Sequence, residues 1–184
     1  MVTDDDRRLA RRASSAIYQN HVKNGPNGWD AHHIASEIGY EEMLRRGLLA
    51  ECDWARRFGG TVNEALLAYG DGGRDFPLDL WTPQGVRRFN VNIKAKSVQR
   101  SWEGLRQSGT HLRVPVAECD PLTIYVFAIY LEPTDDAEVL AWDWGRTLIR
   151  QNERRQFEGG TQPWNYVRLF EDLRDLEELK RRMV

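Results

Sequence analysis

One carboxylate and one Asn-Ile-Lys triplet have the residue types and spacing for metal-assisted chemistry. Asp75 opens a segment of alternating apolar and polar residues, and Asn92, Ile93 and Lys94 lie within another. In a strand, residues 92 and 94 point the same way about 6.6 Å apart, while Ile93 points into the core and offers its carbonyl oxygen. If the two segments pair as a hairpin, a carboxylate, an amide oxygen and an ammonium group meet. That combination suits a hard divalent cation and its bound water.

Plainer interpretations of the same residues stay open on spacing alone. Asp75 could cap the turn formed by GDGG at 70–73, and Lys94 could be a solvated strand residue. Asp79 shares a face with Asp75 but lies about 13 Å further along the strand, which makes it a poor second ligand for one ion.

Longer motifs surround these residues in a definite order. The segment GDGGRDF (70–76) is followed by FNVNIKAKS (89–97), and GLLAECDWARRFGG (47–60) precedes both. Together they resemble the PD-(D/E)xK nuclease superfamily, specifically its small phage- and prophage-encoded, resolvase-like endonucleases. Further on, HLRVPVAECDPLTIYVFAIYL and EVLAWDWGRTLI are similar to the strand, hairpin and short helix that follow the active site in that group. The resemblance covers about residues 47 to 150.

The resemblance implies a role for each matching residue. Asp75 would be the central ligand of Mg²⁺ (or Mn²⁺), with the main-chain carbonyl of Ile93 as a further ligand. Lys94 would orient the attacking water, help to deprotonate it and offset the charge that develops on the phosphate. Glu51 would hold the metal's outer shell or a second ion, although a surface ion pair explains Glu51 equally well. The implied reaction is metal-dependent hydrolysis of a DNA phosphodiester bond.

The chain departs from the family pattern at Asn92, where the family has Asp or Glu. An amide oxygen can still ligate Mg²⁺, but the site loses one negative charge. Three interpretations stay open: a naturally degenerate site that binds DNA without cutting it, weak cleavage with help from Glu51, or a deliberate Asp→Asn change that traps a substrate complex. The main alternative to an endonuclease is therefore a catalytically silent nucleic-acid-binding protein on the same scaffold. A protein-interaction factor without a nucleic-acid role is a third hypothesis.

The distribution of charge favours a polyanionic partner despite a formal net charge of −2. Residues 87–113 contain seven Lys or Arg and one acidic residue, whereas residues 114–145 contain seven acidic residues and no basic one. One face can then present a positive strip to DNA while the acidic segment lies on the far side; scattering over several faces is the alternative. The predicted nucleic-acid contacts are Arg88, Lys96, Arg100 and, by stacking on a base, Trp102.

Periodicity predicts the elements that must position these residues. Helical spacing is expected over 5–22 and 31–58, with Gly39 and Gly47 as potential breaks and Gly59 and Gly60 as its end. Strands are expected at 62–69, 75–81 and 87–97 (an antiparallel meander with one wet face), then at 122–131 (a central strand covered on both sides), 138–144 and 165–170. Pro77 predicts an open side for its strand. Helices are expected at 146–151 and, as a charged closing helix, at 171–183.

These elements predict an α/β (α+β) fold with a restriction-endonuclease-like core, in which helices flank a central mixed sheet. The 184 residues suffice for one core. We therefore expect an N-terminal helical extension and loop at 1–30 and a PD-(D/E)xK nuclease-like domain at 31–184.

Composition argues against a membrane partner and for a cytoplasmic location. No apolar run reaches the 18 or so residues of a membrane span, and the N-terminus lacks an apolar signal segment. The two cysteines share no CxxC spacing and suit a reducing compartment. Since many members of the nuclease family act as dimers, the resemblance leaves a homodimer open, but no dimer patch stands out in the sequence.

Overall fold

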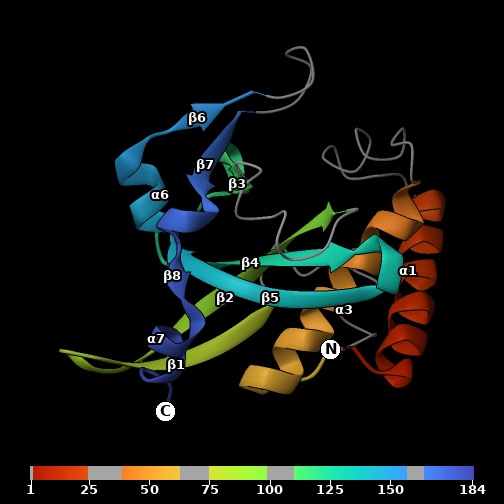
Figure 1. Cartoon of the computed structure of the whole chain (residues 1–184), viewed down its shortest axis with the longest axis horizontal. Helices are drawn as coiled ribbons and strands as arrows, with labels where there is room; N and C mark the ends of the chain where they lie inside the picture. Colours follow the sequence, from red (N-terminus) through yellow and green to blue (C-terminus); the bar gives the residue numbers. More distant parts are fainter. Residues whose placement is uncertain (1, 25–38, 63–74, 99–109, 157–163) are drawn as a thin grey trace.

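The computed structural model describes residues 2–24, 39–62, 75–98, 110–156 and 164–184. In this part of the chain the main sheet has five strands, in the order β1 (Phe76–Thr82), β2 (Gly85–Val98), β4 (Thr123–Leu131), β5 (Asp136–Trp144) and β8 (Arg174–Asp175). A second sheet has the order β3 (His111–Pro115), β7 (Asn165–Leu169) and β6 (Arg154–Arg155). The α-helices are α1 (Asp4–Asn24), α3 (Tyr40–Phe58), α6 (Gly145–Gln151) and α7 (Leu176–Lys180), so the fold is mixed α/β (Figure 1).

The main sheet is mixed because its connections differ in length. A short turn joins β1 to β2, and these strands pair antiparallel. β2 and β4 are parallel, which requires a long crossover between them. β4 then pairs antiparallel with β5. All nine residues of β4 are buried, which confirms the predicted central strand, and β1 is an edge strand, as Pro77 predicts.

α3 covers one face of the main sheet, and α1 packs alongside α3 (Figure 1). Buried residues of both helices share a core with the sheet, including Ala13, Leu49 and Trp54. α3 begins after Gly39 and ends at Gly59, whose φ angles of 76° and 87° favour glycine. Gly47 does not interrupt the helix. Most of the predicted strand at 62–69, the first segment of the predicted long helix (31–38) and the predicted domain boundary at residue 30 lie outside the described residues.

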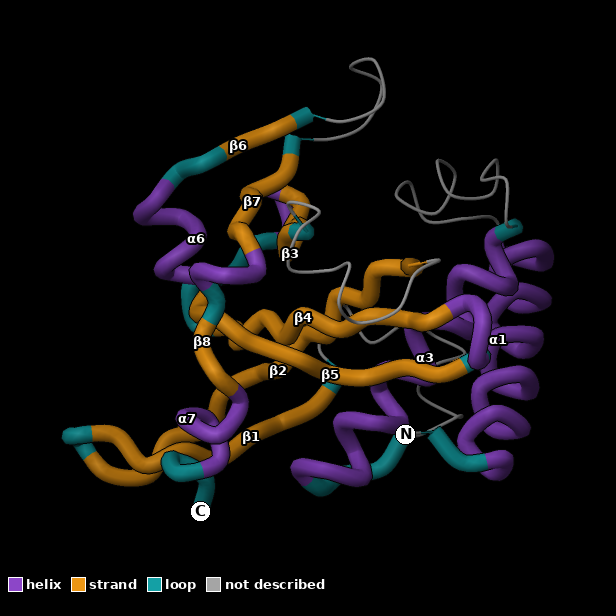
Figure 2. Tube along the Cα trace, in the orientation of Figure 1, coloured by secondary structure: helices purple, strands orange, loops and turns teal. Residues whose placement is uncertain are grey.

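The second sheet lies over the opposite face of the main sheet (Figure 2). Leu112 and Val114 of β3 pack with Tyr125, Phe127 and Ile129 of β4. This packing corrects the prediction that one face of the β1–β2 hairpin is wet throughout. Phe89, Val91 and Ile93 of β2 face the helix-side core as predicted, but Ala95, which was expected with them, is exposed. On the other face, Asn92 is buried and the lysines that follow it are half-buried.

The predicted charged helix over 171–183 is wrong, because only α7 is α-helical there. The segment before it forms a 3-10 turn, η4 (Phe170–Asp172), and the short strand β8, which pairs with β5. Asp175 caps α7 by accepting a hydrogen bond of 2.7 Å from the Glu177 amide. After α7 the chain turns back to β1, where the Arg182 carbonyl accepts from the Trp81 amide at 2.7 Å. Two further 3-10 turns, η1 (Val116–Glu118) and η2 (Glu132–Thr134), flank β4.

No helix among the described residues is both long enough and apolar enough to cross a bilayer.

Candidate functional site

Asp75 lies at the start of β1, against the middle of β2. Its amide donates to the Val91 carbonyl at 2.9 Å, and its carboxylate accepts a hydrogen bond from the Ile93 amide. The N–H and C=O of one strand residue point to the same neighbouring strand, so the Ile93 carbonyl faces the same edge. Phe76 fixes this position, because its ring is buried 6.3 Å from the ring of Trp54. The carboxylate is therefore held beside the peptide group that joins Asn92 to Ile93.

Asn92 and Lys94 lie on the face of the main sheet that the second sheet covers. In the parallel register Asn92 is opposite Tyr125 and Lys94 is opposite Phe127, and both partners belong to the core under the second sheet. The Asn92 side chain is only 5% exposed. The Lys94 ammonium is 3.3 Å from Oε2 of Glu118, in an ion pair that is partly shielded from water.

Glu118 is a residue that the sequence argument missed. It lies in η1, just before β4, and Tyr125 anchors it there. The Tyr125 hydroxyl donates to the Glu118 carbonyl at 2.9 Å and accepts from the Asp120 amide at 2.9 Å. The acidic segment 114–145 is expected on the far side from the basic residues of 87–113. Glu118 is an exception, because it belongs to the acidic segment and pairs with Lys94. No local pattern could have shown it, because the parallel register brings Glu118 to β2.

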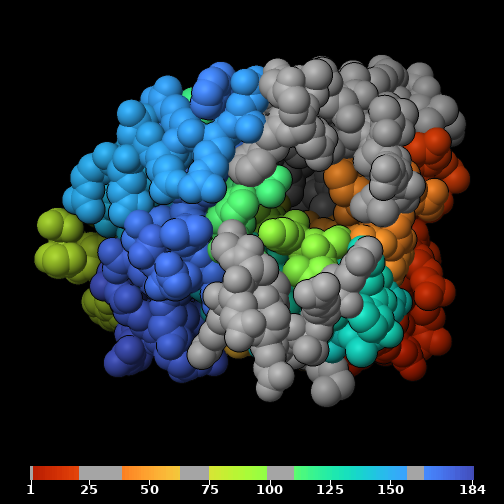
Figure 3. Space-filling model, turned by 45° about the horizontal axis from the view of Figure 1, so that its top comes forward, coloured from red at the N-terminus to blue at the C-terminus, as the bar shows by residue number. Residues whose placement is uncertain are grey.

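Lys96 continues the same face of β2 and lies near another cation. It is half-buried, and burial, followed by the charge of Arg113, lowers the pKa of its ammonium. Arg113 on β3 donates through Nε to Nε2 of His111 at 2.8 Å. Among the described residues, Lys96 forms no salt bridge with a carboxylate. The yellow-green end of β2 and the green β3 reach the surface next to each other (Figure 3). Two neighbouring cations in this setting favour a bound anion.

Glu51 is carried by α3, on the opposite side of the sheet from Asn92 and Lys94. Arg46 donates to the Ser97 hydroxyl at 2.9 Å, and Trp54 is next to Phe76, which pairs with Val91. Glu51 therefore lies alongside the stretch of β2 between Val91 and Ser97.

The remaining predicted contacts lie elsewhere. Arg88 is at the far end of β2 and is clamped by Asp79 through two hydrogen bonds of 2.9 and 2.8 Å. The hydrogen bond from Arg88 lowers the pKa of Asp79. Arg100 and Trp102 lie outside the described residues.

The donor atoms that Asp75, Asn92 and Ile93 offer are all oxygens, two at the edge beside Asp75 and one on the covered face. Asp75 offers its carboxylate, Ile93 its carbonyl, and Asn92 an amide oxygen that is enclosed by protein. This set fits Mg²⁺ or Mn²⁺ in chemistry, although it carries a single negative charge. Within the described ranges no group of three or more His, Cys, Asp or Glu side chains could hold a metal ion. Any ion here therefore depends on the amide and carbonyl oxygens.

The cysteines do not add a nucleophile to this edge. Burial raises the pKa of Cys52 to about 12 and that of Cys119 to about 11. Both thiols therefore stay protonated at neutral pH and are weak nucleophiles and poor metal ligands.

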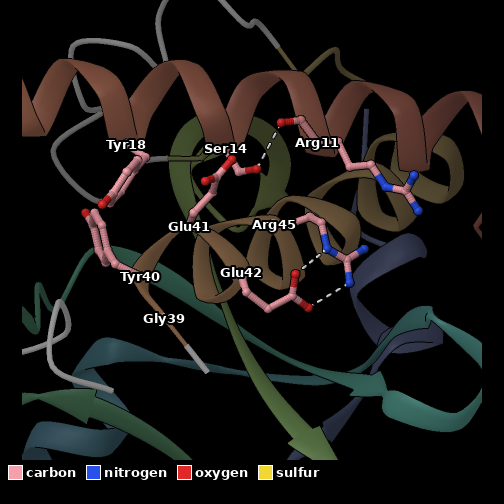
Figure 4. Close-up of a pocket in the computed structure, with 8 residues that line it drawn as sticks. All are labelled: Arg11, Ser14, Tyr18, Gly39, Tyr40, Glu41, Glu42 and Arg45. Carbon is pink, nitrogen blue, oxygen red and sulfur yellow. Dashed lines mark hydrogen bonds and ion pairs between the residues drawn. The ribbon is translucent and has the colours of Figure 1, made fainter. Parts of the chain in front are cut away.

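A cavity of about 480 Å³ lies away from this site, between α1 and α3 (Figure 4). Arg45 lines it, but two hydrogen bonds of 2.7 Å tie its guanidinium to Glu42, and a third of 2.8 Å ties it to Asp135. These contacts hold the pKa of Glu42 near 2, mainly through the hydrogen bond from Arg45. The cations and carboxylates that line the cavity are balanced, which indicates a structural role.

Comparison with protein-family models, with curated proteins and with solved structures finds no match for this chain.

Proposed function

We propose that this chain is a metal-dependent endonuclease that hydrolyses DNA phosphodiester bonds with Asp75, Asn92, Ile93 and Lys94. The observation that carries the proposal is the hydrogen bond between the Asp75 carboxylate and the Ile93 amide. It places an acid from one strand beside the Asn-Ile-Lys segment of its neighbour, as a shared metal centre would require.

The topology also supports a restriction-endonuclease-like core. A hairpin carries the acid and the Asn-Ile-Lys segment, a parallel strand follows it across a crossover, and the amphipathic helix α3 packs behind both. Each of these parts also occurs in other α/β proteins. The restriction-endonuclease-like core is therefore proposed together with the function.

Each side chain then has a distinct task. A bound Mg²⁺ or Mn²⁺ would supply Lewis acidity and a more acidic water. Asp75, the Ile93 carbonyl and Asn92 would hold the ion, and the backbone hydrogen bond keeps the Asp75 carboxylate in place. The Lys94 ammonium would orient the water and offset the charge that develops on the phosphate. Lys96 and Arg113 would bind a neighbouring phosphate.

A nicking assay on supercoiled, linear, branched and single-stranded DNA tests this function. The Asn92→Asp variant restores the missing charge, and we expect it to raise Mg²⁺-dependent cleavage by about 100-fold, the range of one preorganised electrostatic group. Asp75→Ala should abolish cleavage and, in calorimetry, ion uptake. Asp79→Ala, on the same strand at its far end, is the control and should bind ions as the unmodified chain does. The absence of cleavage by Asn92→Asp on every substrate would refute the endonuclease.

A catalytically silent nucleic-acid-binding protein is the second candidate. Two observations favour it: an uncharged residue at position 92, and the ion pair of Lys94 with Glu118, which neutralises the proposed catalytic ammonium. This candidate predicts a salt-sensitive DNA affinity that is the same in the unmodified chain and in Asp75→Ala. It also predicts that the chain takes up no divalent ion.

A further inference from the structure

A second concave site lies at the far end of the β1–β2 hairpin, between the hairpin, the end of β5 and the start of α6. We call it the hairpin pocket, and its volume is about 190 Å³. Its lining includes three aromatic residues and three arginines: Trp81, Phe89, Trp144, Arg87, Arg146 and Arg182. No carboxylate is among the lining residues in the described part of the chain.

The rings of the pocket are held in place, and much of its rim is open to solvent. Phe89 meets Trp144 edge to face, with 4.9 Å between the ring centroids. The guanidinium of Arg146 lies 4.5 Å from the centroid of the Trp144 ring. Trp81 is 59% exposed although its ring is large and apolar. The pocket thus combines an exposed tryptophan with a guanidinium stacked on a second one, and a planar group that covers such a surface is bound favourably.

The size and charge of the pocket select the kind of ligand. It is smaller than the roughly 300–1,000 Å³ of pockets that enclose a whole drug-sized molecule, so it fits one ring system of a larger ligand. Aromatic faces stack on any nucleobase, and guanidinium groups bind the phosphates on either side of it. Arg182 is paired with Glu178 at 2.7 Å, but Arg87 and Arg146 form no salt bridge with a carboxylate of the described residues. Protein interfaces are also rich in Trp and Arg, but two arginines without a carboxylate partner favour a polyanion.

We infer that the hairpin pocket binds one unpaired base of a nucleic-acid strand and that its arginines contact the flanking phosphates. The inference rests on the proposed nucleic-acid partner but not on cleavage. Successive residues of a strand point to opposite faces, so the pocket residues Arg87 and Phe89 lie on a different face of β2 from Lys94. The pocket is therefore a separate contact for an unpaired strand, and a flapped DNA should bind more tightly than a blunt duplex.

Fluorescence anisotropy with a fluorescein-labelled oligothymidine of about 20 nucleotides, with a flapped duplex and with a blunt duplex tests this inference. Trp81→Ala should weaken oligothymidine binding by about fivefold to a hundredfold, the range for one stacked base, and leave its salt dependence unchanged. Arg146→Gln should reduce the slope of log affinity against log salt by about 0.7, the value for one single-strand phosphate contact. The flapped duplex should bind more tightly than the blunt one.

Two matched variants serve as controls. Trp164→Ala removes a tryptophan that is 53% exposed at the start of β7, and Arg155→Gln removes an exposed arginine of β6 that pairs with Glu153. Both should bind DNA as the unmodified chain does, and urea denaturation verifies that all four variants fold.

Unchanged affinity in both pocket variants would overturn the inference. The inference would also be overturned if Trp81→Ala binds oligothymidine normally but sediments as a smaller species than the unmodified chain. The pocket would then be an interface between protein chains. A chain that binds oligothymidine through Trp81 but never cuts DNA, even as Asn92→Asp, would refute the endonuclease and support the pocket.

Discussion

The two ends of the β1–β2 hairpin have similar residue types and opposite environments. At the inner end, Asn92 is buried and Lys94 and Lys96 are half-buried under η1 and the second sheet. At the outer end, Trp81, Val86 and Arg88 are exposed. Both ends carry polar and basic residues in the same strand alternation. What packs on the strand, rather than the strand itself, makes the difference.

The free-energy cost of a positive charge therefore differs between the two ends. Burial and the nearby Arg113 lower the pKa of Lys96, so its charge lowers the stability of the folded chain. Arg88 forms a hydrogen-bonded pair with Asp79 in full contact with water, where its charge is easily solvated. A bound anion would offset the cost of the Lys96 charge at the inner end, whereas the Asp79 carboxylate already accompanies Arg88 at the outer end.

The sharpest contrast should come from truncating one aromatic residue at each end. Phe127, under the inner end, is 1% exposed, and Phe127→Ala should lower the free energy of unfolding by about 3–5 kcal/mol because it leaves a cavity. Trp81→Ala at the outer end should change it by less than about 0.5 kcal/mol, since little packing is lost. Urea denaturation measures both. Equal losses would show that the outer end is also part of the folded core.

The charge at position 92 should reveal whether the inner end is built for a cation. Asn92→Asp places a carboxylate in a buried position, and without metal we expect a loss of about 1–3 kcal/mol of unfolding free energy. Millimolar Mg²⁺ should restore stability, because an ion that binds the folded state stabilises it. Melting in EDTA and in Mg²⁺ measures this, with Asn90→Asp on the same face as the control. The same melting temperature for Asn92→Asp in both buffers would argue against a metal site.

Tyr125 links the inner end to η1 through the two hydrogen bonds of its hydroxyl group. Tyr125→Phe removes the hydrogen bonds to Glu118 and Asp120, and it should cost about 1–2 kcal/mol because two backbone groups lose their partner. Tyr166→Phe, on β7, is the matched control, since within the described residues its hydroxyl accepts only one long hydrogen bond, of 3.4 Å, from Arg154. The comparison fails if both variants are equally stable in urea.

The smallest change in stability should come from Lys96, and it should have the opposite sign. A lysine with a lowered pKa in the folded state destabilises the protein below that pKa, and stability recovers as the pH rises toward the ordinary lysine pKa of 10.5. Lys96→Met should therefore raise the unfolding free energy by at most about 0.5 kcal/mol near neutral pH and flatten its rise under alkaline conditions.

The same substitution should weaken duplex DNA binding and reduce the salt slope by about 0.9, the value for one phosphate contact. Denaturation at pH 7 and 10 and anisotropy at several salt concentrations measure the two effects. If Lys96→Met lowers stability and leaves DNA affinity intact, Lys96 is a packing residue and not a phosphate contact.

Local pattern was sufficient for some elements and not for others. Strict alternation around Leu78 predicts β1, and an unbroken apolar run predicts the buried strand β4; both are confirmed. The closing segment was mistaken for one long helix because its charged residues are compatible with a helix. Pairing of β8 with β5 and of Trp81 with Arg182 decided otherwise, and these contacts join residues far apart in the chain.

By itself, the sequence determined the alternating strands, the amphipathic helix that ends at Gly59, and the presence of Asp75 and the Asn-Ile-Lys segment on adjacent strands, because each follows from short-range periodicity. Only the tertiary structure decided that Glu118 meets Lys94, that Glu51 lies on the other side of the sheet, and that one end of the hairpin is covered while the other is open. These features depend on the parallel register of β2 with β4 and on where the second sheet packs. Both are set by contacts between distant residues, which leave no periodic signal in the chain.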